Sequence, residues 1–144
     1  MLPTTGAVVV TLPTSTSIQV GSLGVGTTAS GTTGEIVATN NITAFFSDMR
    51  LKTVVGKLNN SLDKINTLDG FLFTPNEKAQ SLGYDGSIVE VGLSAQQVQA
   101  ILPEVIRPAP IDPEYMTFDY AKLMPMVVEA IKELTDRIKA LENK

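Results

Sequence analysis

The sequence predicts an α+β protein. A short N-terminal β-stalk leads into a small antiparallel sheet with helices and then into a long C-terminal coiled-coil helix, and three copies of the chain intertwine. Residues 1–45 are rich in Thr, Ser, Gly and Val and carry one charge, Glu35, whereas charged residues recur every few positions after Phe46. Beyond that point, β-branched segments bounded by turn residues alternate with helical patterns. Residues 120–144 repeat apolar side chains at spacings of four and three.

This change of composition predicts two domains, residues 1–46 and 47–144. The first contains a Gly, Thr and Ser run at 21–34 that has little to bury. Short strands are expected on either side of this run, at residues 7–20 (broken at Pro13), 35–39 and 42–46.

The N-terminal segment cannot build a core of its own. A disordered linker is the alternative, but such linkers usually carry high net charge, and this segment is nearly neutral and half built from strand formers. Strands of this kind become stable when three copies wind around each other, so we interpret residues 1–46 as the end of a trimeric β-stalk. So short a stalk suggests a piece of a longer chain.

The second domain is expected to open with a helix over residues 53–68, followed by a β-hairpin or small antiparallel sheet. Gly70 ends the helix, a strand begins at Phe71, and residues 87–93 return as its partner. The helix is predicted from one apolar face with spacings of four, four, three and three: Val54, Leu58, Leu62, Ile65 and Leu68.

A short helix over residues 95–102 is expected next, capped by Ser94 and ended by Pro103. Residues 107–113 hold three prolines and predict an extended loop. Residues 115–118 then form a last short strand.

The C-terminal helix is expected to begin at Tyr120, after an Asp119 cap, and to reach the end of the chain. Its apolar positions alternate by four and three, which is a heptad seam. The seam positions are Tyr120, Met124, Val127, Ile131, Leu134, Ile138 and Leu141.

The seam composition bears on the number of helices in the coiled coil. Ile at a and Leu at d would by themselves favour a two-helix coiled coil, but Val128 and Ala130 widen the apolar face and favour three helices. Glu133 and Arg137, four residues apart, are expected to support the solvent face. The alternative is a helix packed on its own domain, which we expect to hold for its first half.

Composition excludes several function classes. The chain has no Cys and no His, which removes disulfides, thiolate metal sites and a Ser/His/Asp triad, so we expect no metal and no cofactor. The eleven Lys and Arg are scattered in a chain of net charge −4, so we expect no nucleic-acid partner. No apolar run is long enough to span a membrane and no basic N-terminal region marks a signal peptide, which predicts a protein made in the cytoplasm.

Three blocks of residues carry a resemblance to a known family. They are Ser47-Asp48-Met49-Arg50-Leu51-Lys52, then Gly92 to Val98 with Leu102-Pro103-Glu104-Val105, then Tyr120 to Pro125 leading into the last helix. Together they resemble the C-terminal intramolecular chaperone domain of phage endosialidases, tail spikes and tail fibres, a domain shared with myelin regulatory factor. Gln97 departs from the pattern, because members often carry Glu there.

The resemblance implies a trimerisation and folding module for the part of a fibre or spike that precedes it. Its partners would be two further copies and the upstream domain, and it would be assembled in the host cytoplasm as part of a virion tail. The resemblance further implies self-cleavage between Phe46 and Ser47 by a Ser47/Lys52 dyad, a single-turnover serine peptidase without a cofactor. The alternative is a structural or receptor-binding tip that stays attached, in which Ser47 and Asp48 merely cap a helix and Lys52 is a surface residue.

The chemistry sets a geometric condition on this pair. A serine hydroxyl needs a base, and lysine becomes one only when burial or a neighbouring cation, to which Arg50 is a candidate contributor, favours the neutral amine. Five residues of ideal helix rise about 7.5 Å and leave the two side chains roughly 140° apart, so they would not meet. Either residues 47–50 form a turn and not a helix, or Lys52 comes from a neighbouring copy.

Overall fold

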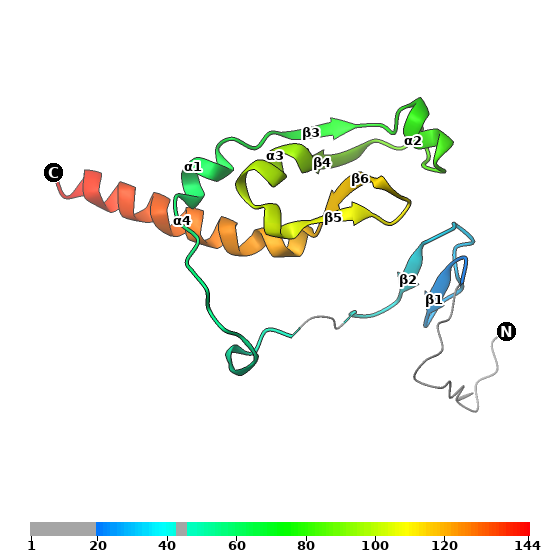
Figure 1. Ribbon diagram of the computed structural model, residues 1–144, viewed down its shortest axis with the longest axis horizontal. Helices are drawn as coiled ribbons and strands as arrows, with labels where there is room; N and C mark the ends of the chain where they lie inside the picture. Colours follow the sequence, from blue (N-terminus) through cyan, green and yellow to red (C-terminus); the bar gives the residue numbers. More distant parts are fainter. Residues whose placement is uncertain (1–19, 43–45) are drawn as a thin grey trace. The chain divides into compact units, whose positions relative to one another are not determined.

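The computed structural model describes residues 20–42 and 46–144 (Figure 1). The chain forms two compact units with a boundary between Thr53 and Val54. The domain boundary predicted after Phe46 stays a prediction.

The N-terminal unit contains a two-stranded parallel sheet. Strand β1 (Leu23–Val25) pairs with β2 (Ile36–Ala38), with Leu23 opposite Ile36. Strand β2 confirms the strand predicted at 35–39, whereas β1 lies in the Gly, Thr and Ser run, for which the pattern predicts no strand. No side chain of residues 20–42 is buried, so this described segment has no core of its own. The strands predicted at 7–20 and 42–46 lie almost wholly outside the described residues.

The helix predicted over residues 53–68 is wrong for its first half. Only α1 (Ser61–Ile65) is helical, and residues 52–59 have no regular secondary structure. Three β-branched residues are followed by Gly56, all poor helix formers, and Asn60 adopts a left-handed backbone with φ +55° that helix does not tolerate. Val55 is 99% exposed, so the apolar spacing in this stretch does not reflect a face buried within the chain.

The predicted antiparallel sheet is confirmed. Strand β3 (Gly70–Phe73) pairs with β4 (Glu90–Leu93), and a short helix α2 (Glu77–Ser81), which the sequence pattern did not predict, lies between them. The close approach at Gly92 explains the residue type, because a Cβ there would lie 3.1 Å from a Phe73 ring carbon and 3.3 Å from the Tyr120 hydroxyl.

Helix α3 (Ala95–Ile101) follows directly and confirms the Ser94 cap, whose hydroxyl accepts the Gln97 amide at 3.4 Å. Pro103 opens a 3₁₀ turn, η2 (Pro103–Val105). Pro103 therefore both ends α3 and, with its fixed φ, starts the next turn.

The extended loop predicted at residues 107–113 is wrong. These residues belong to a hairpin in which β5 (Ile106–Ala109) pairs antiparallel with β6 (Asp112–Phe118). The pairing shifts register between Pro108 and Ala109. Both strands of a two-stranded hairpin are edge strands. Proline has no backbone N–H, and it is tolerated at an edge position where that N–H would point away from the partner strand.

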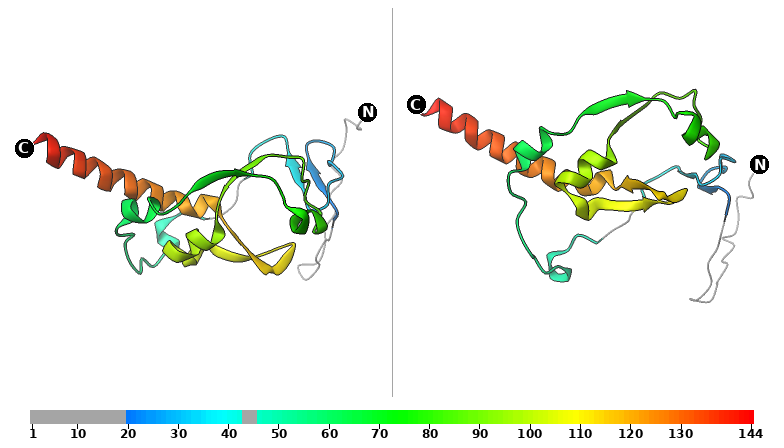
Figure 2. Two further views of the ribbon diagram at one scale, coloured as in Figure 1. Left: turned by 90° about the horizontal axis from the view of Figure 1, so that it is seen from above. Right: turned by 45° about the horizontal axis from the view of Figure 1, so that its top comes forward.

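The C-terminal helix α4 (Tyr120–Glu142) begins after Asp119, whose carboxylate accepts the Ala121 amide at 3.0 Å, as predicted. In Figure 2 the other elements of this unit gather along its N-terminal part, and its last turns extend past them. The first half thus packs on its own chain. The core consists of three residues before the helix and three on it: Val98, Leu102, Val105, Leu123, Met126 and Ala130.

Helix α4 also holds α1 in place. The two carboxylate oxygens of Glu133 accept the backbone amides of Ser61 and Leu62, both at 2.9 Å, and the Arg137 guanidinium lies 2.9 Å from Asp63. The amides of Leu62 and Ser61 lower the pKa of Glu133. The expectation that Glu133 and Arg137 support a solvent face is therefore wrong, because each reaches across to α1.

Candidate functional site

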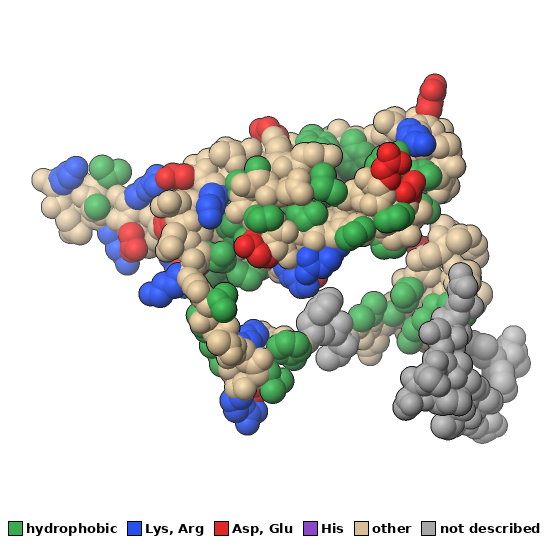
Figure 3. Space-filling model, in the orientation of Figure 1, with side chains coloured by type: hydrophobic (Ala, Val, Ile, Leu, Met, Phe, Trp, Pro, Cys, Tyr) green, Lys and Arg blue, Asp and Glu red, His purple; other side chains and the backbone are tan. Residues whose placement is uncertain are grey.

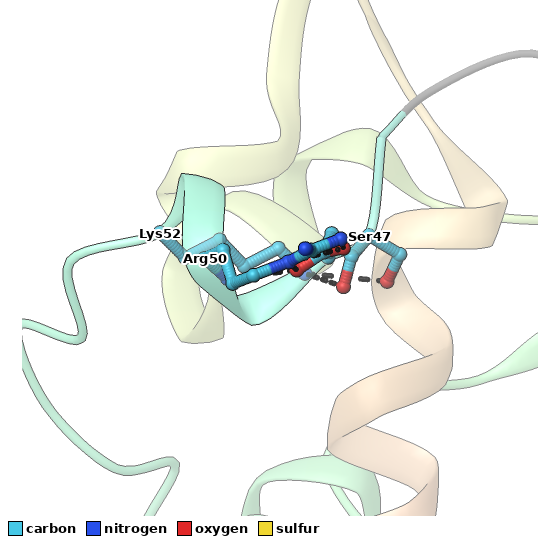
Figure 4. A network of polar contacts seen from close by, with 4 residues as sticks. Ser47, Arg50 and Lys52 are labelled. Atoms are coloured by element: carbon cyan, nitrogen blue, oxygen red, sulfur yellow. Dashed lines mark hydrogen bonds and ion pairs between the residues drawn. The ribbon is translucent and has the colours of Figure 1, made fainter.

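Ser47 and Lys52 lie together in the structure. The Lys52 Nζ donates to the Ser47 Oγ at 3.2 Å and to the Ser47 backbone carbonyl at 3.1 Å (Figure 4). Both residues belong to the same chain, so the contact requires no neighbouring copy. Of the two arrangements that the sequence left open, the structure contains the turn.

The turn is η1 (Met49–Leu51), a single 3₁₀ turn between two extended residues, Asp48 and Lys52. The amide of Leu51 donates to the Asp48 carbonyl and that of Lys52 to the Met49 carbonyl, both at 3.1 Å. Because a 3₁₀ turn is tighter than an α-turn and ends at once, the side chain that follows it returns toward Ser47.

Asp48 and Arg50 form an ion pair beside this contact. The Arg50 Nη2 lies 2.7 Å from the Asp48 Oδ2, and its Nε lies 3.1 Å from both carboxylate oxygens. The Arg50 side chain, and then its backbone amide, lower the pKa of Asp48, and the carboxylate in turn raises the pKa of Arg50. Arg50, a candidate cation beside Lys52, is therefore balanced by its own carboxylate partner.

The pair is open to solvent. Ser47 and Lys52 are both exposed, and Phe46, on the other side of the predicted cleavage bond, is 68% exposed. A lysine acts as a general base when it is desolvated, and no cover of that kind is present around this pair among the described residues. Ser47 and Lys52 therefore have the geometry of a catalytic dyad, but neither side chain is buried.

The seam positions of α4 form a face beside the one that packs on the chain's own core. Val127 is partly buried, and the other seam residues are exposed. Figure 3 shows hydrophobic and charged side chains side by side along the projecting end of α4. The exposed seam residues are Tyr120, Met124, Ile131, Leu134, Ile138 and Leu141.

Two positions of the second block have roles that the sequence pattern did not predict. The Gln97 side-chain amide donates to the Asp69 carboxylate at 2.8 Å, and its oxygen accepts the Asp69 backbone amide at 3.3 Å. The Leu93 amide donates to the Tyr120 hydroxyl at 3.1 Å. These bonds join the ends of β3 and β4 to α3 and α4, so the second and third blocks of the family resemblance meet in space.

No helix within residues 20–42 and 46–144 has both the length and the apolar character that crossing a membrane requires.

Comparisons with known proteins agree with the three blocks. Residues 47–107 match the family described as chaperone of endosialidase. The long tail fiber protein Gp37 of Enterobacteria phage K3 is 32% identical over 117 residues, which is 77% of this chain and 9% of that protein. The Gp37 proteins of phages T2 and AR1 are 32% and 29% identical, over 77% and 60% of this chain.

The chain spans less than a tenth of the length of these curated relatives. The family match begins at Ser47, the residue that starts the first block, and runs through the second. Residues 47–107 are therefore similar to the chaperone of endosialidase family.

Proposed function

We propose that this chain is the trimerising and folding chaperone of a phage tail fibre, and that it releases itself by cutting the bond between Phe46 and Ser47. The observation that carries the proposal is the contact of Ser47 Oγ with Lys52 Nζ, 3.2 Å apart at the first residue of the family match. The similarity to Gp37 tail fibre proteins supports a location in the virion tail, with the upstream fibre as the segment that is folded.

The proposed trimer is supported by α4. Leu123, Met126 and Ala130 are buried within the chain, whereas all the seam residues except the partly buried Val127 remain exposed on the neighbouring face. An apolar heptad face that the chain does not cover is typical of a coiled coil. Assembly through this face would hold three chains parallel, and three upstream segments could then wind together as a stalk.

The proposed reaction uses the groups of the turn. The Ser47 hydroxyl gives its proton to the Lys52 amine while its oxygen attacks the carbonyl carbon of Phe46. The bond from that carbon to the Ser47 nitrogen then breaks, the nitrogen takes up a proton, and an ester joins Phe46 to the Ser47 oxygen. Water hydrolyses the ester, leaving a carboxylate on Phe46 and a free amino group on Ser47.

Activation of the lysine requires a cover. In the single chain the ammonium donates its hydrogen bond to Ser47, whereas catalysis requires the neutral amine to accept one from it. Desolvation favours the neutral amine. We infer that assembly supplies this cover, which would delay release until the three chains have joined.

A denaturing gel of the full chain tests cleavage. We expect two fragments of one third and two thirds of the chain, and one uncut band for both Ser47→Ala and Lys52→Ala. Lys57→Ala is the matched control, because Lys57 is an exposed lysine after the same turn, and it should cut like the unmodified chain. A single uncut band from the unmodified protein would refute cleavage and favour a structural or receptor-binding tip that stays attached.

A further inference from the structure

We propose that Asp48 is the positioning residue of the Ser47–Lys52 pair, and that it acts by capping the turn between them. The inference rests on the proposed self-cleavage and adds a residue to it. Within the described residues the Asp48 carboxylate hydrogen-bonds to Arg50, and Lys52 faces it only as a charge. Its effect on the reaction runs through the backbone.

The cap hydrogen bond lies at the point where the chain reverses. The Asp48 Oδ1 accepts the Arg50 amide at 2.8 Å, which satisfies one of the free amides at the start of η1. If residues 47–52 were extended instead, their five steps would span about 16 Å. The turn brings the Lys52 Nζ within 3.2 Å of the Ser47 Oγ.

The same carboxylate has a second contact, the ion pair with the Arg50 side chain. That side chain is 89% exposed, and an ion pair in water contributes little because solvent and salt screen it. The backbone cap does not depend on the charge, because a neutral amide oxygen accepts the same hydrogen bond. The structure therefore assigns the positioning effect to the cap and predicts that Asn replaces Asp48 while Ala does not.

The test measures the first-order rate of self-cleavage in the full chain. Loss of a cap hydrogen bond shifts the equilibrium between the formed and the open turn by about two- to thirtyfold. Asp48→Ala should therefore cut about that much more slowly. Asp48→Asn should keep most of the rate. Asp85→Ala is the matched control, because the Asp85 Oδ1 likewise accepts the amide two residues on, that of Ser87, at 2.8 Å, away from the pair in sequence. This control should cut like the unmodified chain.

Three results would overturn the proposal. Asp48→Ala cutting at the unmodified rate would show that the cap does not position the pair. Asp48→Asn cutting as slowly as Asp48→Ala would place the effect in the charge. An equal loss in Asp85→Ala would reduce it to a general effect of turns on the fold.

A second measurement separates this proposal from self-cleavage itself. In the uncut Ser47→Ala chain, the NMR shift of the Arg50 amide should follow the titration of the Asp48 carboxyl. The charges that face this carboxyl are Arg50 and Lys52. If the unmodified chain never cuts but the Arg50 amide follows Asp48, the turn exists and self-cleavage fails. If the unmodified chain cuts but the Arg50 amide of the Ser47→Ala chain does not respond to Asp48, the positioning proposal fails alone.

Discussion

The seam of α4 gives the most direct test of assembly. Ile131 and Leu134 are 59% and 45% exposed in the single chain, so together they leave about one whole aliphatic side chain uncovered. Burial of that much apolar surface is worth about 1.5–3 kcal/mol per chain. Across three chains this amounts to about 5–9 kcal/mol, which changes the association constant of the trimer by at least about a thousandfold. The double variant Ile131→Ser, Leu134→Ser should therefore lose the trimer.

Sedimentation equilibrium over a range of concentrations measures this loss, and circular dichroism checks that the chain remains folded. The fold should survive, because the core residues of α4 are not changed. Lys132→Ser is the matched control. It lies between the two positions, is exposed, and forms an ion pair with Glu129 at 2.6 Å. If the double variant sediments with the mass of the unmodified trimer, or if the unmodified protein is a monomer, the seam assignment is wrong.

Three further predictions concern the fold. Met126→Ala should lower the free energy of unfolding by about 2–5 kcal/mol, because the side chain is fully buried, and urea denaturation that shows no change would contradict this core. Gly92→Ala should cost about 1–3 kcal/mol, because its Cβ would meet the Phe73 ring at 3.1 Å; an unchanged thermal midpoint would show that the ring yields freely. Glu133 has a lowered pKa in the fold, so its stabilisation is present above the ordinary 4.5 and is lost as the pH falls through the folded value. In Glu133→Gln the free energy of unfolding should therefore depend less on pH in the acid range than in the unmodified chain. If the two chains lose stability equally as the pH falls, the bond from Glu133 to α1 is not supported.

The features that the sequence predicted correctly are those fixed by short-range chemistry. Ser94 and Asp119 cap α3 and α4, and each acts within two or three residues of its own position. The pairing of β3 with β4 follows similarly from two apolar segments with turn residues between them. The Leu93 amide at the end of β4 also donates to the hydroxyl of Tyr120, far along the chain, a contact that no local pattern indicates.

The incorrect predictions have a common cause. The spacing of Val54 and Leu58 fits a helix, but Gly56 and the left-handed Asn60 prevent one, and periodicity does not register backbone conformation. Likewise, Glu133 and Arg137 have the spacing of a surface pair, yet both contact α1. A spacing rule considers one helix at a time, whereas these two side chains serve a tertiary contact.

The candidate site lies between these cases. The sequence supplies Ser47 and Lys52 and the condition that a turn must join them, but not the turn itself. The Asp48 cap is a signal present in the sequence next to Ser47, but an aspartate that caps the amide two residues on also opens helix α4 at Asp119. The cap therefore marks where a turn or a helix begins, and it does not by itself select the short turn over the helix.

The geometry of the site and its activation have different physical origins. The contact between Ser47 and Lys52 is made by residues 47–52 alone, through the Asp48 cap and one 3₁₀ turn, so each chain can form it before it meets another. Desolvation of Lys52 is the part that the described chain does not supply. On the proposed mechanism, assembly would control the reaction by covering a pair that is already in place. A lysine delivered from a neighbouring copy is not needed, and mixing Ser47→Ala with Lys52→Ala chains should then restore no cleavage.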